Sequence, residues 1–169
     1  MDRDGDADLD RFNAWFTLLQ AHSAVVESLE HKLESEAGVP LAWHEVLSRL
    51  VVAPEGRLRM LDLAGLIMLS KSGVTRLVDR MEGAGLVTRG SCATDRRVTY
   101  AIITPKGRAT FERLRPVFSR GVDEYFSRHL SDADTRHLRS ALRKVLQGNG
   151  RWEKDRCSAP ASEPAHTSS

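Results

Sequence analysis

The chain has 169 residues, which suits one folded domain and is long enough to bury a core. Aromatic residues make up only 6% of the chain, and the composition favours a mainly helical protein. The net charge of +2 is unevenly spread, because residues 57–108 hold 10 Lys and Arg against 4 Asp and Glu while residues 1–56 hold 4 against 11. A local basic excess of this kind is typical of a phosphate-binding surface.

The sequence also excludes several classes of protein. No apolar run approaches the length of a membrane span, and the acidic N-terminus does not have the pattern of an export signal. The two cysteines, Cys92 and Cys157, are widely separated, which argues against a disulfide framework and favours a reducing cytoplasm. There is no glycine-rich phosphate loop, nucleophile elbow or paired metal motif, so we do not expect an enzyme.

The first part of the chain predicts one long helix. Residues 1–8 are acidic and poor in apolar residues, and we expect them to be a disordered lead-in. From Leu9, apolar residues recur at helical spacing, and Gly38 and Pro40 end the pattern, so the helix covers residues 9–37. A helix of this length is hard to bury in a small domain and is expected to pack against a partner chain.

The middle of the chain predicts a helix-turn-helix. Helices are expected over residues 42–51 and 61–68, with a short strand over residues 57–60 between them. The next helix begins after Ser70, a suitable N-cap, and ends before Gly85. Its apolar residues fall on one face and its basic and hydroxyl residues on the other, as in a helix that lies in the DNA major groove.

A β-hairpin is expected directly after this helix. Residues 86–89 and 98–103 have strand composition, and the loop 90–97 between them is polar and basic. Thr104 and Pro105 then open a helix towards Arg128, which Pro116 and Gly121 should bend or break in two. A capping-box pattern at 131–134 starts a last helix to about residue 147, and residues 148–169 have the composition of a disordered tail.

Taken in order, the chain resembles the MarR (multiple antibiotic resistance regulator) family of winged-helix repressors. The residues that carry the resemblance are Asp62-Leu63-Ala64, Leu69-Ser70, Val74 to Glu82, Gly85-Leu86-Val87 with Arg89, Asp95-Arg96-Arg97, and Ile103-Thr104 before Gly107. The resemblance implies a mainly α fold with a small β-hairpin wing, that is, a winged helix-turn-helix with long N- and C-terminal dimerisation helices. It implies a single domain over 9–147, with the winged helix at 41–104 and dimerisation helices at 9–37 and 105–147.

The function that the resemblance implies is a homodimeric repressor, released from a pseudo-palindromic double-stranded DNA operator by a small-molecule effector. On the recognition helix, groove contacts are expected from residues of the first two turns, and phosphate contacts from basic residues beside them. The expected DNA-binding residues are Ser70, Lys71, Ser72, Thr75, Arg76, Arg80, Arg89, Arg96 and Arg97. By resemblance, Arg96 or Arg97 enters the minor groove and Asp95 shapes the wing, while Asp79 could pair with Arg76 or Arg80.

The sequence indicates the effector-binding residues less clearly than the DNA-binding residues. Trp15, His22, Trp43 and His44 could bind a small aromatic or anionic molecule, although packing in the core is the alternative role for both tryptophans. The histidines show no tight ligand spacing, and we expect no metal or cofactor. The peroxide-sensing branch of the family has a cysteine near the start of the first helix, where this chain has Trp15; Cys92 could still be oxidised in the wing.

Two alternatives to an effector-responsive repressor remain open. The basic face could serve an acidic protein partner, in which case the winged helix is a protein-interaction module. The chain could also bind DNA without responding to any small molecule. Binding to duplex DNA that weakens steeply with added salt separates the first alternative from DNA recognition.

Overall fold

The computed structural model describes residues 3–67, 70–91 and 98–150, with the backbone alone for residues 3–7. The chain divides into two compact units, residues 1–128 and residues 129–169. In chain order the first unit contains α1 (Arg3–Ala37), α2 (Leu41–Val52), β1 (Arg57–Arg59), α3 (Met60–Leu66), α4 (Lys71–Gly83), β2 (Val87–Ser91), β3 (Thr99–Ile103) and α5 (Pro105–Tyr125). The second unit contains α6 (Asp132–Gly148). The described helices and strands follow the predicted order, and the mainly α fold with a small β wing is confirmed.

The three strands form one antiparallel sheet in the order β1-β3-β2. β3 is central, pairing Ile102 with Arg57 of β1 and Ala101 with Arg89 of β2. β2 is therefore an edge strand, paired along one side only. The predicted hairpin is confirmed, and β1 adds the third strand at the position that the sequence indicated.

One apolar core is formed by buried residues of α2, α4 and the sheet, together with residues of α1, α3 and α5. α2 contributes Val46, Leu47 and Leu50, all fully buried. The predicted apolar face of α4 is buried completely: Val74, Leu77, Val78 and Met81 are each at most 2% exposed. Burial of such side chains contributes about 1.5–3 kcal/mol each, so this face fixes the rotation of α4 about its own axis.

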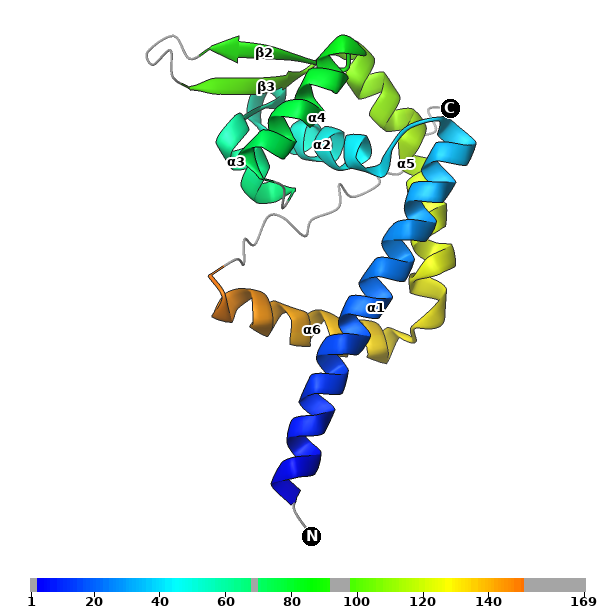
Figure 1. Ribbon diagram of the computed structural model, residues 1–169. Helices are drawn as coiled ribbons and strands as arrows, with labels where there is room; N and C mark the ends of the chain where they lie inside the picture. The colour runs from blue at the N-terminus through cyan, green and yellow to red at the C-terminus, as the bar shows by residue number, and fades with distance from the viewer. Residues whose placement is uncertain (1–2, 68–69, 92–97, 151–169) are drawn as a thin grey trace, which may run out of the picture. The chain divides into compact units, whose positions relative to one another are not determined.

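The C-terminal half of α1 and the length of α5 lie side by side (Figure 1). Leu29 and Leu33 of α1 and Leu114 of α5 are buried in the same core as α4. The Lys32 ammonium joins the two helices, lying 2.9 Å from Glu124 Oε2. We call α2, α3, α4 and the three strands the winged-helix lobe. This lobe therefore shares its core with the long helices α1 and α5.

Helix α1 begins at Arg3, six residues before the predicted start at Leu9. The prediction of a disordered lead-in over residues 1–8 is thus wrong for residues 3–8. Acidic residues are favourable in the first turns of a helix, because they complement its dipole, so this acidic segment extends the amphipathic helix by its own first turns.

Helix α5 runs without interruption from Pro105 to Tyr125, so a break in two at Pro116 or Gly121 is wrong, while the bend that the sequence offered as the alternative stays a prediction. Phe111, Leu114 and Val117 are buried on both sides of the proline, and this packing offsets the one backbone hydrogen bond that Pro116 cannot donate. Gly121 is buried against Leu29 of α1, where it permits close approach of the two helices.

In the second unit, α6 begins at the predicted capping box. Ser131 Oγ accepts a hydrogen bond from the Asp134 N–H, and the Asp134 carboxylate accepts one from the Ser131 N–H. The helix ends at Gly148, close to the predicted end. Residues 151–169, most of the predicted tail, lie outside the described residues. No helix in the described parts of the chain is both long enough and apolar enough to cross a bilayer.

The start of α5 is anchored on the turn between α4 and β2. Thr104 Oγ1 accepts a hydrogen bond from the Gly107 N–H at 3.0 Å and donates one to the Gly85 carbonyl at 2.7 Å. Gly107 is buried so closely that a Cβ there would lie 2.1 Å from the Leu86 carbonyl oxygen.

We expect Gly107→Ala to lower the free energy of unfolding by about 1–3 kcal/mol, because a backbone oxygen must move to admit the methyl group. Urea denaturation at fixed protein concentration measures the change. Gly65→Ala is the matched control: Gly65 is helical, and no atom of the described residues lies within 4 Å of a Cβ there, so the change should raise stability by about 0.5–1 kcal/mol. Equal stability of the two variants would contradict this anchoring.

Candidate nucleic-acid interface

Helix α4 is capped at both ends by the residues that the sequence indicated. Ser70 Oγ accepts a hydrogen bond from the Gly73 N–H at 3.1 Å. At the other end Gly85 has φ +73°, and the Leu86 N–H donates to the Met81 carbonyl at 2.9 Å. These caps fix where the helix begins and ends, and so which residues form its first turns.

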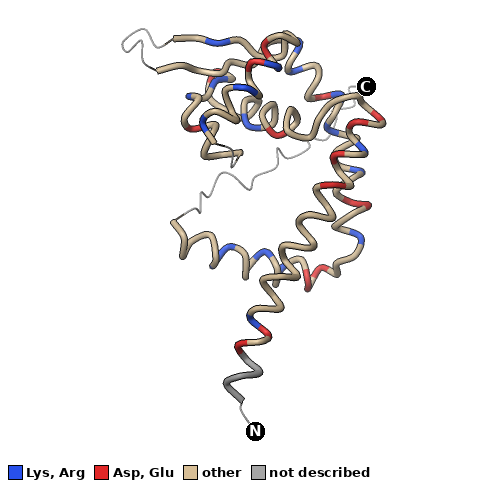
Figure 2. Tube along the Cα trace, in the orientation of Figure 1, with Lys and Arg blue, Asp and Glu red and all other residues tan. Residues whose placement is uncertain are grey.

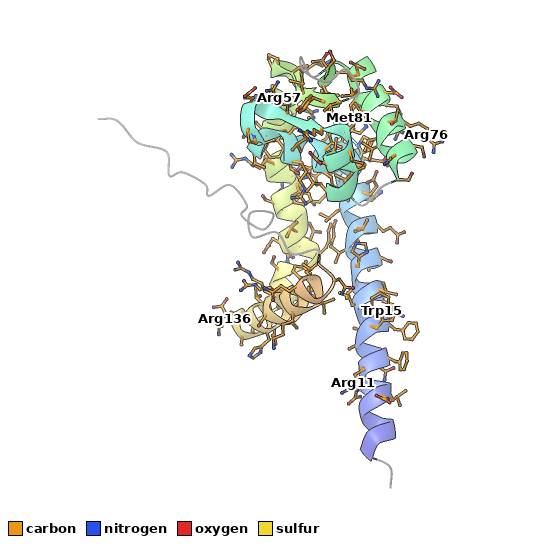
Figure 3. All side chains as sticks on the ribbon, turned by 90° about the vertical axis from the view of Figure 1, so that its left-hand side faces the viewer. Arg11, Trp15, Arg57, Arg76, Met81 and Arg136 are labelled. Carbon is orange, nitrogen blue, oxygen red and sulfur yellow. The ribbon has the colours of Figure 1, made fainter. Side chains whose placement is uncertain are left out.

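The outer face of α4 is polar and exposed. Its exposed residues are Ser70, Lys71, Ser72, Thr75, Arg76, Asp79 and Arg80. Figure 3 shows Arg76 at the outer edge of the lobe and Met81 within it. Hydroxyl groups and guanidinium groups are thus presented together on one side of a rigid helix, as base and phosphate recognition requires.

The side chains of two arginines of this face, Arg76 and Arg80, make no hydrogen bond or ion pair with any other residue that the structure describes. A hollow of about 670 Å³ runs along this side of α4, lined by Ala42, Gly73, Arg76, Leu77, Asp79 and Arg80. Both guanidinium groups therefore border open surface. Lys and Arg positions, blue in Figure 2, recur along this lobe, which contains most of the basic segment 57–108.

The hydroxyl groups on the outer face are partly engaged within the helix. Thr75 Oγ1 donates to the Lys71 carbonyl at 2.9 Å, and Ser70 and Ser72 join their hydroxyls at 3.2 Å. Ser70 also caps the helix, because its hydroxyl accepts the hydrogen bond from the Gly73 N–H. A ligand contact that preserves this cap uses the remaining hydrogen-bonding capacity of the hydroxyl.

Asp79 does not pair with Arg76 or Arg80, as the sequence suggested, but with Arg89 of β2. The Arg89 guanidinium also contacts Glu82, with Nη1 3.2 Å from Oε2. That expectation was wrong because Arg76 and Arg80 are near Asp79 only along the helix, whereas the turn after α4 brings Arg89 of β2 alongside Asp79. Glu82 was not singled out in the sequence; its place three residues after Asp79, just before the turn into β2, is the signal that could have indicated it.

The predicted wing-tip residues lie outside the described residues. They are Cys92, Asp95, Arg96 and Arg97. Their roles in the minor groove, in shaping the wing and in oxidation stay predictions.

The four predicted effector residues differ in their surroundings. Trp15 (54% exposed) and His22 are exposed on α1, whereas Trp43 is half-buried and His44 is buried on α2. None of the four lines the hollow beside α4. Over the described residues, no group of three or more His, Cys, Asp or Glu side chains is arranged to hold a metal ion.

His44 is stacked on two aromatic rings of α5. Its ring centroid lies 4.0 Å from that of Phe118 and 5.6 Å from that of Phe111. Burial lowers the pKa of His44 from 6.5 to about 4, so the imidazole is neutral near pH 7. Its Nδ1 atom and the Nε1 atom of Trp43 are buried without a hydrogen-bond partner among the described residues.

The fold and this surface define a winged helix-turn-helix transcriptional regulator. The model of the MarR family matches residues 37–98. The chain is 32% identical to AbsC, a MarR family transcriptional regulator from Streptomyces coelicolor, over 82% of this chain and 93% of AbsC, with a TM-score of 0.76. The chain belongs to the MarR family, and the predicted resemblance is confirmed.

Two further relatives support this assignment. Sco3205 from Streptomyces coelicolor, solved in complex with DNA, is 27% identical over 83% of this chain and 88% of Sco3205, with a TM-score of 0.77. The regulator MhqR of Bacillus subtilis is 34% identical over 79 residues, which are 47% of this chain and 54% of MhqR. The family and these relatives are transcriptional regulators, not enzymes, in agreement with the sequence.

The burial of His44 predicts a pH dependence of stability. Below pH 6.5 the imidazole of His44 binds a proton in the unfolded chain, whereas in the folded chain it stays neutral down to about pH 4. The free energy of unfolding should therefore fall by about 3 kcal/mol as the pH falls through this range, and be fully recovered above pH 6.5.

Urea denaturation between pH 7.5 and 4 measures this dependence. His44→Leu should flatten the curve by removing the titrating group, whereas His31→Gln, at an exposed position of α1, should leave it unchanged. An unchanged slope in His44→Leu would show that His44 is not the residue responsible.

Proposed function

We propose that this regulator reads a double-stranded DNA operator by placing α4 in the major groove. The observation that carries the proposal is the division of α4 into a fully buried apolar face and an exposed face of hydroxyl and guanidinium groups. The fork of Arg76 matches the O6 and N7 acceptors of guanine. Ser70, Ser72 and Thr75 supply further groove contacts, while Lys71 and Arg80 bind phosphates.

The hairpin behind α4 completes this mode of binding. In the proposal, Arg96 or Arg97 enters the neighbouring minor groove, and Asp95 orients the loop. The β2–β3 pair supports it by carrying the chain away from the helices towards that loop (Figure 1). Groove contacts would then come from two elements that a single core holds together.

The regulator acts as a homodimer through the N-terminal half of α1. In a single chain this half exposes a row of large apolar side chains at helical spacing: Leu9, Phe12, Trp15, Phe16 and Leu19. Phe12 is 63% exposed, and a contiguous row of this kind marks a protein interface. A second copy of the chain is the occupant, because two-fold symmetry would match the two halves of a pseudo-palindromic operator.

In the proposed cycle, the dimer represses transcription in the cytoplasm until a small aromatic or anionic effector releases it from the operator. Buried Trp43 Nε1 and His44 Nδ1 support an effector site near the start of α2, since each lacks a hydrogen-bond partner among the described residues. Trp15 and His22, both exposed on α1, stay further candidates for effector contact, and Trp15 also belongs to the apolar row of the proposed dimer interface. DNA binding without an effector is the alternative.

We expect Arg76→Ala to weaken binding about 10- to 100-fold to a duplex that the native protein selects from a random pool, and to relax its sequence preference. Fluorescence anisotropy at fixed salt measures both effects. Arg115→Ala is the control, because Arg115 pairs with Glu112 on the surface of α5 and should leave affinity unchanged. Unchanged affinity in Arg76→Ala would contradict the groove assignment.

Phe12→Glu should raise the dimer dissociation constant at least about tenfold, because it places a charge in the apolar row of α1. Analytical ultracentrifugation over a concentration series measures the constant. Ala14→Glu puts the same charge on the opposite side of the helix and should have a smaller effect. A Phe12→Glu chain that dimerises as tightly as the native chain would exclude this face as the interface.

A further inference from the structure

Arg89 is the most heavily engaged arginine on the α4 side of the lobe. Its Nη1 atom lies 2.5 Å from Asp79 Oδ1 and 3.2 Å from Glu82 Oε2, and its Nη2 atom donates to the Thr75 carbonyl at 3.2 Å. The backbone N–H of Arg89 donates to Glu82 Oε1 at 2.9 Å. Side chain and main chain of one residue are thus both bound to α4.

These contacts form a ladder along one side of the helix. Thr75, Asp79 and Glu82 are four and three residues apart, so they occupy successive turns on the side of α4 that faces β2. β2 is an edge strand of the sheet, and among the described residues it pairs with β3 alone. Arg89 therefore attaches β2, the first strand of the wing, to three successive turns of α4.

The same contacts pair both carboxylates of α4, Asp79 and Glu82, with the Arg89 guanidinium. Asp79 lies one helical turn after Arg76, and a free carboxylate there would draw the Arg76 guanidinium away from DNA or repel phosphate. The Arg89 side chain is only 29% exposed and holds both Asp79 and Glu82. Among the described residues Arg76 and Arg80 are left without an ion-pair partner.

We propose that Arg89 is a positioning residue for DNA binding, which braces the wing on α4 and occupies Asp79 and Glu82, in place of the phosphate contact that its charge alone suggests. The inference rests on the proposed function, in which α4 and the wing contact DNA together. It makes one prediction that runs against simple electrostatics: removing the two acids should weaken binding to DNA.

The test compares variants on a duplex that the native protein selects from a random pool, with affinity measured by anisotropy over a salt series. The variants are Arg89→Gln, Arg89→Lys and the double variant Asp79→Asn/Glu82→Gln. Asp62→Asn is the matched control, because it removes an exposed carboxylate from α3, outside the ladder. Thermal melting of each variant reports whether it is folded.

The brace predicts that Arg89→Gln and the double acid variant each weaken binding about tenfold, and that combining them costs no more than either alone. The slope of log affinity against log salt should equal that of the native protein. Arg89→Lys should bind as weakly as Arg89→Gln, because one ammonium cannot replace a fork that reaches three partners. Asp62→Asn should bind as the native protein or slightly tighter.

A phosphate contact at Arg89 predicts a different pattern. Arg89→Gln would then lower the salt slope by about 0.9, Arg89→Lys would retain binding, and the acid variant would bind as tightly as the native protein or tighter. Any of these results overturns the proposal. Should Arg89→Gln fail to fold, the acid variant and Arg89→Lys still decide between the two roles.

The outcomes also separate this inference from the proposed function. If native protein binds the selected duplex and Arg76→Ala does not, while the Arg89 and acid variants bind normally, the brace is wrong and the groove assignment stands. If the native protein enriches no sequence and its binding is insensitive to salt, the proposed function itself is wrong, and the brace has no DNA-binding role to serve.

Discussion

The burial of one face of α4 is the constraint on which the rest of the structure depends. Val74, Leu77, Val78 and Met81 are at most 2% exposed, so α4 cannot rotate without exposing apolar surface at a cost of several kcal/mol. The polar face is outward as a consequence, and it carries the Arg76 guanidinium to the open surface. A surface helix with the same residues but without a buried face would present its polar side chains in many orientations. Binding DNA would then cost the conformational entropy of ordering that helix.

The seat of α4 is continuous with the long helices of the first unit. Thr104 and Gly107 hold the start of α5 against the turn that ends α4, while Leu29 and Leu33 of α1 enter the same core. His44 stacks on α5 from within α2, the helix that borders the hollow beside α4 through Ala42. α1, α2 and α5 are thus connected to α4 through packed side chains, which is the kind of contiguous contact that coupling between an effector and DNA would require.

Much of this architecture could be predicted from the sequence because its signals are local. Ser70 and Gly85 marked the ends of α4, and the spacing of apolar residues identified its buried face. The errors arose where long-range packing overrides local preference: Pro116 is tolerated because α5 is buried on both sides of it. Likewise, the partner of Asp79 is ten residues away on a strand, and no helical spacing rule could indicate Arg89.

The most direct test of the central claim is chemical protection of guanine N7, which faces the major groove, on a duplex selected by the native protein. If α4 of each protomer occupies a major groove, dimethyl sulfate footprinting should show protected guanines in two patches about 10 bp apart on one face of the duplex, and Arg76→Ala should restore reactivity at specific positions within both. Guanines that stay fully reactive throughout a saturated complex would show that α4 does not enter the major groove, and would contradict the account.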